Sequence, residues 1–357
     1  MKAAVLWERH SRLKVEEIDL ADLESGEARV RVLASGVCHS DLHHINRETA
    51  FQPPMVLGHE GAGIVDAVAP EVTSVKPGDR VVIMFGSKCG TCHYCHAGED
   101  YLCTAVLPDH PRFTQNSQRL TQLLGVGSFA EYVNVNASNL VPVPDEMPVE
   151  SAALLACGVT TGLGAVTKTA GVQPGSNVAV IGVGGVGMNV VQGAALSGAS
   201  RVIAIDLVER KLEMAQQFGA THMINAADTD PVQAIRDLTH GRGADYVFEV
   251  IGRPETIKQA YDAARRGGTA VVVGLGAANE EVSFPLDELM RSGKAIKGCF
   301  YGAVQPHRDV PRYIDMYLTG RLKIDQLISR RFRLDQVNDA FDAMVAGQVA
   351  RGVIMFE

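Results

Sequence analysis

The chain has 357 residues, enough for two or three domains of ordinary size. Its 33 Lys and Arg residues against 41 Asp and Glu residues give a net charge of −8, which makes nucleic acid and anionic membranes poor candidate partners. No uninterrupted apolar stretch approaches the roughly 18–20 residues that cross a bilayer, and the first apolar run is too short for a signal peptide. We therefore expect a cytoplasmic protein that binds neither nucleic acid nor membranes.

The first 85 residues show the pattern of strands joined by turns. Residues 29–34 alternate in polarity and are rich in β-formers, and residues 61–68 and 80–84 are short apolar runs. A Pro-Gly-Asp turn signal at 77–79 separates the last two. This part of the chain is predicted to be mainly β.

Four of the seven cysteines form a dense cluster after these strands. The odd number of cysteines and the size of the chain argue against a disulfide framework. Four thiolates in one loop fit a tetrahedral zinc ion with a structural role, and a four-cysteine iron–sulfur cluster is the alternative. Since four sulfurs fill the tetrahedron, we expect His93 and His96 at the surface. The cluster consists of Cys89, Cys92, Cys95 and Cys103.

The rest of the chain changes character twice. Residues 104–127 are polar with little periodicity, so a long loop is expected. From about residue 150 strand and helix patterns alternate, which predicts a parallel sheet. The expected strands are 178–181, 202–205, 223–224, 244–249 and 269–273, and the expected helices are one ending near 197, 210–218, 231–239 and 255–264. The last 55 residues are mixed, with helices expected at 310–318 and 334–345 and a strand at 352–356. A nucleotide-binding domain inserted into a discontinuous first domain is the simplest architecture.

A glycine-rich motif opens the alternating region. Gly182-Val183-Gly184-Gly185-Val186-Gly187 fits G-x-G-x-x-G between a predicted strand and helix, the context that dinucleotide binding requires. The first glycine makes the tight turn, the second admits the pyrophosphate, and the third lets helix and strand pack closely. Asp206, at the end of the next strand, would hold a ribose 2′-OH and repel a 2′-phosphate, which favours NAD over NADP. Arg210 and Lys211 could contact the ribose, although a solvated helix start explains them equally well.

Three further residues complete a recognisable set. Cys38 lies in Gly36-Val37-Cys38-His39-Ser40-Asp41, His59 in Gly58-His59-Glu60-x2-Gly63, and Cys157 in Ala156-Cys157-Gly158. Their spacing alone does not bring them together, and buried structural cysteines would be the simpler interpretation. Together with the four-cysteine cluster and the later glycine motif, however, they resemble zinc-dependent alcohol dehydrogenases of the medium-chain dehydrogenase/reductase superfamily. The resemblance covers essentially the whole chain.

The resemblance implies a fold and two metal sites. The α/β chain would have a β-rich, GroES-like catalytic domain (1–155 and 301–357) and a Rossmann domain with a doubly wound parallel sheet (156–300). Besides the structural zinc, Cys38, His59 and Cys157 would hold a catalytic zinc whose fourth position is open to water or substrate. Glu60 would lie beneath this zinc and bind it transiently, and Asp41 would orient His59. Cys299 is left over.

The resemblance also implies a reaction, the reversible oxidation of an alcohol by NAD⁺. Zinc would stabilise the alkoxide, and the nicotinamide would take the hydride. Ser40 would lie beside the alcohol, and His43, three residues later on one helical turn, would pass the proton to water. A surface histidine beside His44 is the alternative for His43.

Several weaker assignments follow from the same family. His39 and Arg351 would contact the pyrophosphate, and Arg351 could also face Glu60. The nicotinamide side of the cofactor would be formed by Thr161, Val186 and Val273, for which plain core packing is the alternative.

The substrate and the assembly are the last expectations. Phe85, Phe129 and Phe300 match positions that line the substrate cleft, so a medium-chain or aromatic primary alcohol is expected. The alternatives are a thiol-adduct formaldehyde dehydrogenase and a non-catalytic zinc- and nucleotide-binding relative. The first of these places charged residues in the cleft, for which Asp109, Arg112 and Arg119 are candidates. Residues 296–302 resemble the subunit-joining strand of the family, so we expect a homo-oligomer, a dimer rather than a tetramer.

Overall fold

The computed structural model describes residues 1–46, 51–86, 88–104, 112–277 and 279–357. The chain divides into two compact units, one formed by Met1–Cys157 with Gln305–Glu357 and the other by Gly158–Val304. The boundaries expected after residues 155 and 300 therefore lie after Cys157 and Val304. As a result, Cys157 belongs to the first unit together with the other candidate ligands of the catalytic zinc.

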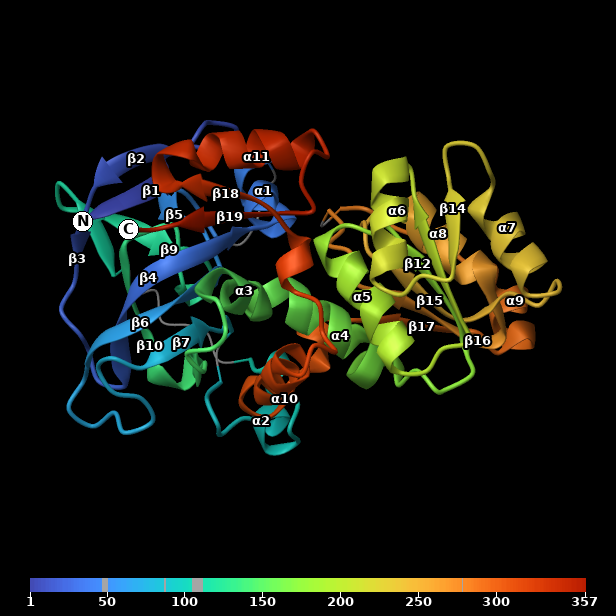
Figure 1. Cartoon of the computed structure of the whole chain (residues 1–357), viewed down its shortest axis with the longest axis horizontal. Coiled ribbons are helices and arrows are strands. Elements are labelled where there is room, and N and C mark those ends of the chain that lie inside the picture. Colours follow the sequence, from blue (N-terminus) through green and yellow to red (C-terminus); the bar gives the residue numbers. More distant parts are fainter. Residues whose placement is uncertain (47–50, 87, 105–111, 278) are drawn as a thin grey trace. The chain divides into compact units, whose positions relative to one another are not determined.

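A seven-stranded sheet carries the first unit (Figure 1). Its order is β11-β7-β6-β4-β19-β18, and β10 also pairs with β4. The pairing of β4 with β19 joins the two segments of this unit, as the expected discontinuous domain requires. The strands are β4 (Glu27–Val37), β6 (Glu60–Val68), β7 (Arg80–Ile83), β10 (Tyr132–Asn136), β11 (Leu140–Pro142), β18 (Ile328–Arg333) and β19 (Arg351–Met355).

A second, six-stranded sheet of the first unit has the order β2-β1-β5-β9-β8-β3. These strands are β1 (Lys2–Leu6), β2 (Lys14–Glu17), β3 (Asp19–Leu20), β5 (Met55–Val56), β8 (Phe113–Gln115) and β9 (Gln118–Gln122). The helices of this unit are α1 (His39–Asn46), α2 (His93–His96), α3 (Val149–Leu154), α10 (Pro306–Leu318) and α11 (Val337–Val345). Side chains of both sheets and of α11 share one hydrophobic core.

The structure corrects the expected loop at 104–127. Within its described part, β8 and β9 form an antiparallel hairpin. The turn residues Asn116 and Ser117 have φ of 49° and 66°, the left-handed pair that a tight hairpin turn needs. Phe113 and Leu120 face each other across the hairpin and are fully buried in the core. Residues 104–127 have a polar composition because few of them are apolar, but Phe113 and Leu120 are enough to attach the hairpin to the core.

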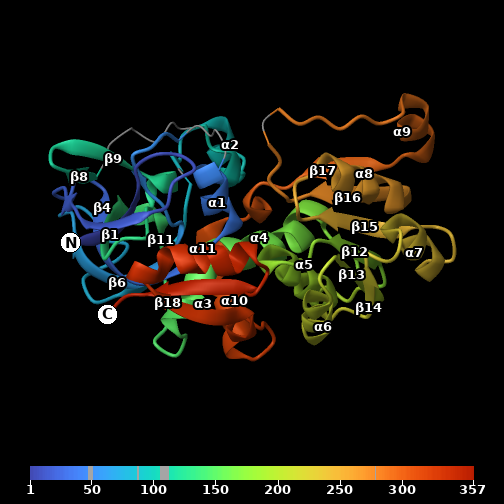
Figure 2. The same cartoon turned by 90° about the horizontal axis from the view of Figure 1, so that it is seen from above.

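The second unit has the predicted parallel sheet, with the order β14-β13-β12-β15-β16-β17. The chain crosses from β14 to the other side of β12 before it continues, which makes a switch point between β12 and β15. Figures 1 and 2 show α5 and α6 on one face of the sheet and α8 on the other. The strands are β12 (Asn177–Ile181), β13 (Arg201–Asp206), β14 (His222–Asn225), β15 (Ala244–Glu249), β16 (Ala264–Val272) and β17 (Ala295–Gly298). The helices are α4 (Thr160–Gly164), α5 (Gly185–Leu196), α6 (Glu209–Gln217), α7 (Pro231–Leu238), α8 (Pro254–Ala263) and α9 (Leu286–Ser292).

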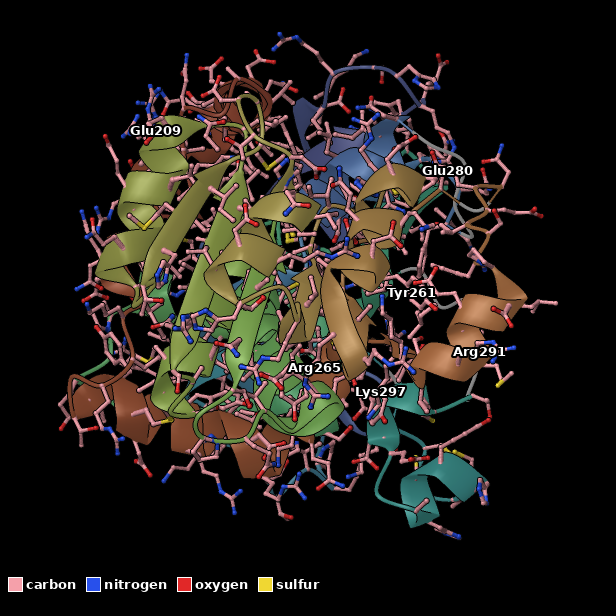
Figure 3. The ribbon with its side chains drawn as sticks, turned by 90° about the vertical axis from the view of Figure 1, so that its right-hand side faces the viewer. Glu209, Tyr261, Arg265, Glu280, Arg291 and Lys297 are labelled. Carbon is pink, nitrogen blue, oxygen red and sulfur yellow. The ribbon has the colours of Figure 1, made fainter. Side chains whose placement is uncertain are left out.

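Helix α8 is fixed at its C-terminal end by an aromatic and cationic contact. Tyr261 is fully buried and its ring centre lies 4.7 Å from that of Phe284. Lys294 Nζ lies 4.6 Å from the Tyr261 ring centre and donates to the Tyr261 carbonyl at 2.9 Å. Arg265, which Figure 3 labels, lies at the start of β16. It pairs with Asp245 on β15. A cation at the end of a helix binds carbonyl groups that have no partner within the helix, so Lys294 stabilises the C-terminal end of α8.

One helical run in the described residues, Val149–Ala170, is long and apolar enough to cross a membrane by length and composition. It joins α3 and α4 through π-helical turns at Leu155–Val159 and Ala165–Ala170. Of its most apolar window, 83% is buried inside the protein, as in a core helix.

Candidate metal centres and cofactor site

The pairing of β4 with β6 brings Cys38 and His59 together. Gly36 of β4 is opposite Glu60 of β6, so the residue that follows β4 and the residue that precedes β6 emerge at the same edge. Cys157 reaches this point from the π-helical turn after α3. One ligand atom from each of four buried residues lies within 4.8 Å of the others: Cys38, His59, Glu60 and Cys157.

Asp41 fixes the backbone and the imidazole of this cluster, which we call the buried metal cluster. Its carboxylate is fully buried and lies 3.0 Å from His59 Nδ1. It also accepts hydrogen bonds from the backbone N–H groups of Gly58 at 3.0 Å and Cys38 at 3.2 Å. His59 Nε2 is then buried without a hydrogen-bond partner in the described part of the chain. A metal-binding imidazole has this arrangement, because a carboxylate holds one nitrogen and the other faces the ion.

The charges of the buried metal cluster call for a cation. The hydrogen bond with Cys157 holds the pKa of Cys38 well below its usual range, and the same bond and burial raise the pKa of Cys157. Burial raises the pKa of Glu60 to about 7 against the opposing charge of Arg351. The buried Cys38 thiolate therefore lies beside a thiol and a carboxyl group that burial keeps from ionising, and a divalent cation would stabilise the ionised form of all three. Two sulfurs and one nitrogen suit zinc and leave a fourth position for a ligand.

Arg351 lies against this cluster. Its Nη2 is 3.1 Å from Glu60 Oε1, and the side chain is only 5% exposed. Of the two roles expected for Arg351, the structure shows the one at Glu60. Gly36 is needed at the same place, because a Cβ there would lie 2.0 Å from Glu60 Oε2.

The residues expected for proton transfer lie on α1. Ser40 Oγ is 3.7 Å from Cys38 Sγ, and His43 follows one turn later on the same face. Both are half-buried, whereas His39 at the start of α1 is exposed. Arg9 is a further residue at this helix and donates to the carbonyls of His44 at 2.9 Å and Phe51 at 2.8 Å. A guanidinium at this position stabilises the C-terminal end of α1, and no sequence motif marks it.

The three phenylalanines expected at the substrate have different surroundings. The Phe85 ring meets the His59 ring edge-on, with centres 5.5 Å apart. Phe300, in the second unit, is 62% exposed. Phe129 is a correction: it is fully buried in the core of the first unit, where its ring packs on Phe341. A side chain with no exposed surface cannot line a cleft.

The charged residues considered for a thiol adduct are also placed. Arg112 is buried and its guanidinium binds Glu27 and Glu24, so it is engaged inside the first unit. Arg119 is exposed on β9, and Asp109 lies outside the described residues. Arg112 is therefore ruled out as a ligand for a substrate carboxylate.

The four cysteines between 89 and 103 form a second cluster, which we call the cysteine lobe. Their ligand atoms all lie within 4.8 Å of one another, and three sulfur–sulfur distances are 3.6, 3.8 and 4.0 Å. Zinc–sulfur bonds of about 2.3 Å give tetrahedral edges of roughly 3.8 Å. Hydrogen bonds from Thr91, through its N–H and its hydroxyl, and from the N–H of Cys92 lower the pKa of Cys89 to about 6. His93 and His96 are exposed, as expected.

The glycine motif in the second unit has the geometry of a dinucleotide turn. Gly182 has a φ of 90°, which only glycine adopts readily. A Cβ on Gly187 would lie 2.0 Å from the Gly182 carbonyl oxygen, whereas a Cβ on Gly184 would meet nothing within 4 Å. Gly187 therefore serves helix–strand packing, and Gly184 leaves open space where a phosphate can approach.

Asp206 lies beside this turn. Its carboxylate accepts hydrogen bonds from Val183 N at 3.0 Å and from Leu207 N at 2.9 Å. Lys211 Nζ is 3.7 Å from Asp206 Oδ1, and Arg210 is exposed. Thr161, Val186 and Val273 are half-buried, so core packing does not fully cover them.

Two family models match most of the chain. The model of the alcohol dehydrogenase GroES-like domain matches residues 24–145, and that of the zinc-binding dehydrogenase matches residues 185–319. Among curated proteins, an S-(hydroxymethyl)glutathione dehydrogenase of Escherichia coli is 39% identical over 369 residues, covering 99% of both chains.

Solved structures agree over the full length. An alcohol dehydrogenase zinc-binding domain protein from Burkholderia ambifaria has a TM-score of 0.94 at 34% identity, covering 100% of this chain and 98% of that one. Benzyl alcohol dehydrogenase from Acinetobacter calcoaceticus also has a TM-score of 0.94, at 32% identity, covering 100% and 99%. The chain therefore belongs to the zinc-dependent alcohol dehydrogenases of the medium-chain dehydrogenase/reductase superfamily, with their GroES-like and Rossmann domains.

Proposed function

We propose that this zinc-dependent dehydrogenase oxidises medium-chain or aromatic primary alcohols to aldehydes with NAD⁺, and catalyses the reverse reaction. The observation that carries the proposal is the contact between the Phe85 and His59 rings. It gives the buried metal cluster an apolar, aromatic neighbour. Such a wall favours a hydrophobic alcohol over a polyol, because a hydroxyl group against it would lose its hydrogen bonds to water.

The residues of the first unit have distinct parts in this reaction. Cys38, His59 and Cys157 would hold the zinc, and Asp41 keeps His59 in the orientation that this needs. When bound, zinc polarises the substrate oxygen and the nicotinamide cofactor takes up the hydride. Ser40 Oγ would receive the proton of the substrate hydroxyl while passing its own proton on, by way of the nicotinamide ribose, to the His43 ring. His43 would then release a proton to water.

A substrate panel tests the proposal. Initial rates of NADH formation would be measured with ethanol, octanol, benzyl alcohol, cinnamyl alcohol and a polyol such as sorbitol. We expect kcat/KM to rise from ethanol to octanol and the aromatic alcohols, because each buried CH₂ adds about 0.8 kcal/mol of transfer free energy. Turnover restricted to polyols or short diols would refute the hydrophobic pocket.

A second function is favoured by several curated relatives at 38–39% identity that are named S-(hydroxymethyl)glutathione dehydrogenases. A glutathione adduct carries carboxylates that need cationic partners, and Arg112 is already bound to Glu24 and Glu27. Formaldehyde would be added to the panel with and without glutathione. Activity that requires glutathione and exceeds that on benzyl alcohol would favour this second function.

We propose NAD rather than NADP as the cofactor, on the position of Asp206 beside the dinucleotide turn. Asp206→Gly is expected to raise the Kd for NAD⁺ about tenfold or more, because a charged partner for the ribose hydroxyls is worth about 1.5–3 kcal/mol. It should also lower the Kd for NADP⁺, since the repulsion of the 2′-phosphate disappears. Both constants would be measured by calorimetric titration. A variant that keeps the original preference would show that Asp206 does not select the cofactor.

We also propose that two copies associate through β17. This strand is at the edge of the parallel sheet, and all four of its residues are exposed. Nearby apolar side chains are exposed as well, with Leu286 at 83% and Met290 at 70%. An edge strand of this kind can pair with its symmetry mate. Light scattering after gel filtration should give twice the mass of the chain, and a monomeric mass for Ile296→Pro, which removes a pairing N–H. A monomeric parent protein would refute the proposal.

A further inference from the structure

Glu249 is a buried carboxylate that neither the family motifs nor the reaction uses. It is the last residue of β15, is fully buried, and belongs to the second unit. Such a group is costly to bury without hydrogen bonds, so its partners should reveal its role.

All the hydrogen bonds recorded for the Glu249 carboxylate converge on one oxygen. Glu249 Oε1 accepts from Ile251 N at 2.9 Å, from Gly252 N at 2.8 Å and from Thr256 Oγ1 at 2.7 Å. Thr256 lies in the first turn of α8. The carboxylate therefore folds the loop at residues 250–253 back onto the end of β15 and stands at a helix N-terminus, which favours negative charge.

This loop packs against the dinucleotide turn. A Cβ on Gly182 would lie 2.6 Å from Ile251 Cγ1, so the Ile251 side chain covers the first glycine of the motif. Gly252 is in turn packed against Leu275, since a Cβ there would lie 2.5 Å from the Leu275 carbonyl carbon. The loop also follows β15, which with β12 forms the switch point of the sheet. Ligands of open parallel sheets bind in the crevice at that point.

We propose that Glu249 is a positioning residue for the dinucleotide: by clamping the loop at residues 250–253, it sets the wall of the cofactor crevice beside Gly182. The clamp acts through backbone N–H groups, so it fixes the path of the loop whatever side chains the loop carries. Glu249 does not itself touch the cofactor, because its side chain has no exposed surface. The role concerns cofactor binding alone and does not depend on which alcohol is oxidised.

The test compares three substitutions of Glu249 by binding, without turnover. The Kd values for NADH, by fluorescence, and for ADP-ribose, by calorimetry, are measured in Glu249→Ala, Glu249→Gln and Glu249→Asp. We expect both values to rise about ten- to a hundredfold in the alanine variant, in line with the loss of a charged hydrogen-bonding group. The glutamine oxygen can accept the same three bonds, so its Kd should stay within about threefold of the parent. The aspartate is one CH₂ shorter and should weaken binding.

Asp245→Asn is the matched control. Asp245 lies on the same strand β15, near its other end, and also accepts a backbone N–H, that of Asn177 at 2.8 Å. It should lower thermal stability without changing either Kd. The proposal would be overturned if the Glu249→Ala protein folds and binds NADH and ADP-ribose with the same Kd values as the parent and the control. If the alanine variant does not fold, equal Kd values in the glutamine and aspartate variants would overturn it, and weakened binding in the aspartate variant alone would support it.

Discussion

Cys38→Ser is expected to lower kcat by about 10³-fold or more while the fold remains intact. A neutral serine hydroxyl is a poor zinc ligand, so the buried metal cluster loses one of its two thiolates. Polarisation of the substrate oxygen by a metal is worth several kcal/mol, and each 1.36 kcal/mol is tenfold in rate. Zinc content should fall from about two to about one per chain, measured by mass spectrometry of the dialysed protein, with an unchanged circular dichroism spectrum.

Cys299→Ser is the matched control for this loss. Cys299 lies in the second unit, outside both cysteine-containing clusters, and receives a hydrogen bond from Thr169 Oγ1 at 3.3 Å. Its variant should keep two zinc ions and parental kcat. A Cys38→Ser protein that turns over normally, or retains both metals, would show that Cys38 is not a catalytic ligand. Loss of activity with the fold intact would also exclude a non-catalytic zinc- and nucleotide-binding protein.

The second unit could be predicted closely because its information is local. Each strand is a short apolar run and each helix follows within a few residues, so period and turn signals predict the alternation of strands and helices from β12 to β16 along the chain. The dinucleotide turn is also local, since Gly182 and Gly187 meet within six residues. The role of Glu249 is not local in this sense. A glutamate at the end of an apolar strand reads as a surface residue, and only the folded loop shows its three donors.

The site of the first unit is harder to predict from the sequence, because it depends on the register between strands that are distant in the chain. The spacing of Cys38 and His59 in the sequence does not predict that Gly36 pairs with Glu60 across the sheet. The family resemblance supplied that relation, and the structure shows the register that produces it. Phe129 illustrates the opposite failure. The family resemblance predicted that Phe129 lines the substrate cleft. Instead its ring packs on Phe341 of α11, which lies more than two hundred residues later in the chain.

Cys103→Ser is expected to unfold the cysteine lobe and leave the rest of the protein folded. Helix α2 of the lobe is one turn long and buries no residue, and neither does the 3-10 turn at Asp100–Leu102, so a hydrophobic core cannot replace the metal. The contacts that tie the lobe to other parts include the bond from Gln305 Nε2 to the Gly98 carbonyl. Limited proteolysis should cut residues 88–104 about tenfold faster or more than in the parent, in keeping with local unfolding. Zinc content should fall to about one per chain.

His93→Ala and His96→Ala are the matched controls, because both histidines are exposed and stand among the four cysteines in the sequence. If four sulfurs fill the tetrahedron, neither variant should lose zinc or gain protease sensitivity. A histidine variant that loses one zinc would mean that an imidazole replaces a thiolate in the lobe. A Cys103→Ser protein that keeps two zinc ions and a resistant lobe would show that the lobe folds without its fourth sulfur. The histidine variants test which side chains bind the zinc, and Cys103→Ser tests whether the lobe needs the zinc to fold. The sulfur–sulfur distances of 3.6–4.0 Å support both a four-sulfur site and a lobe held by metal.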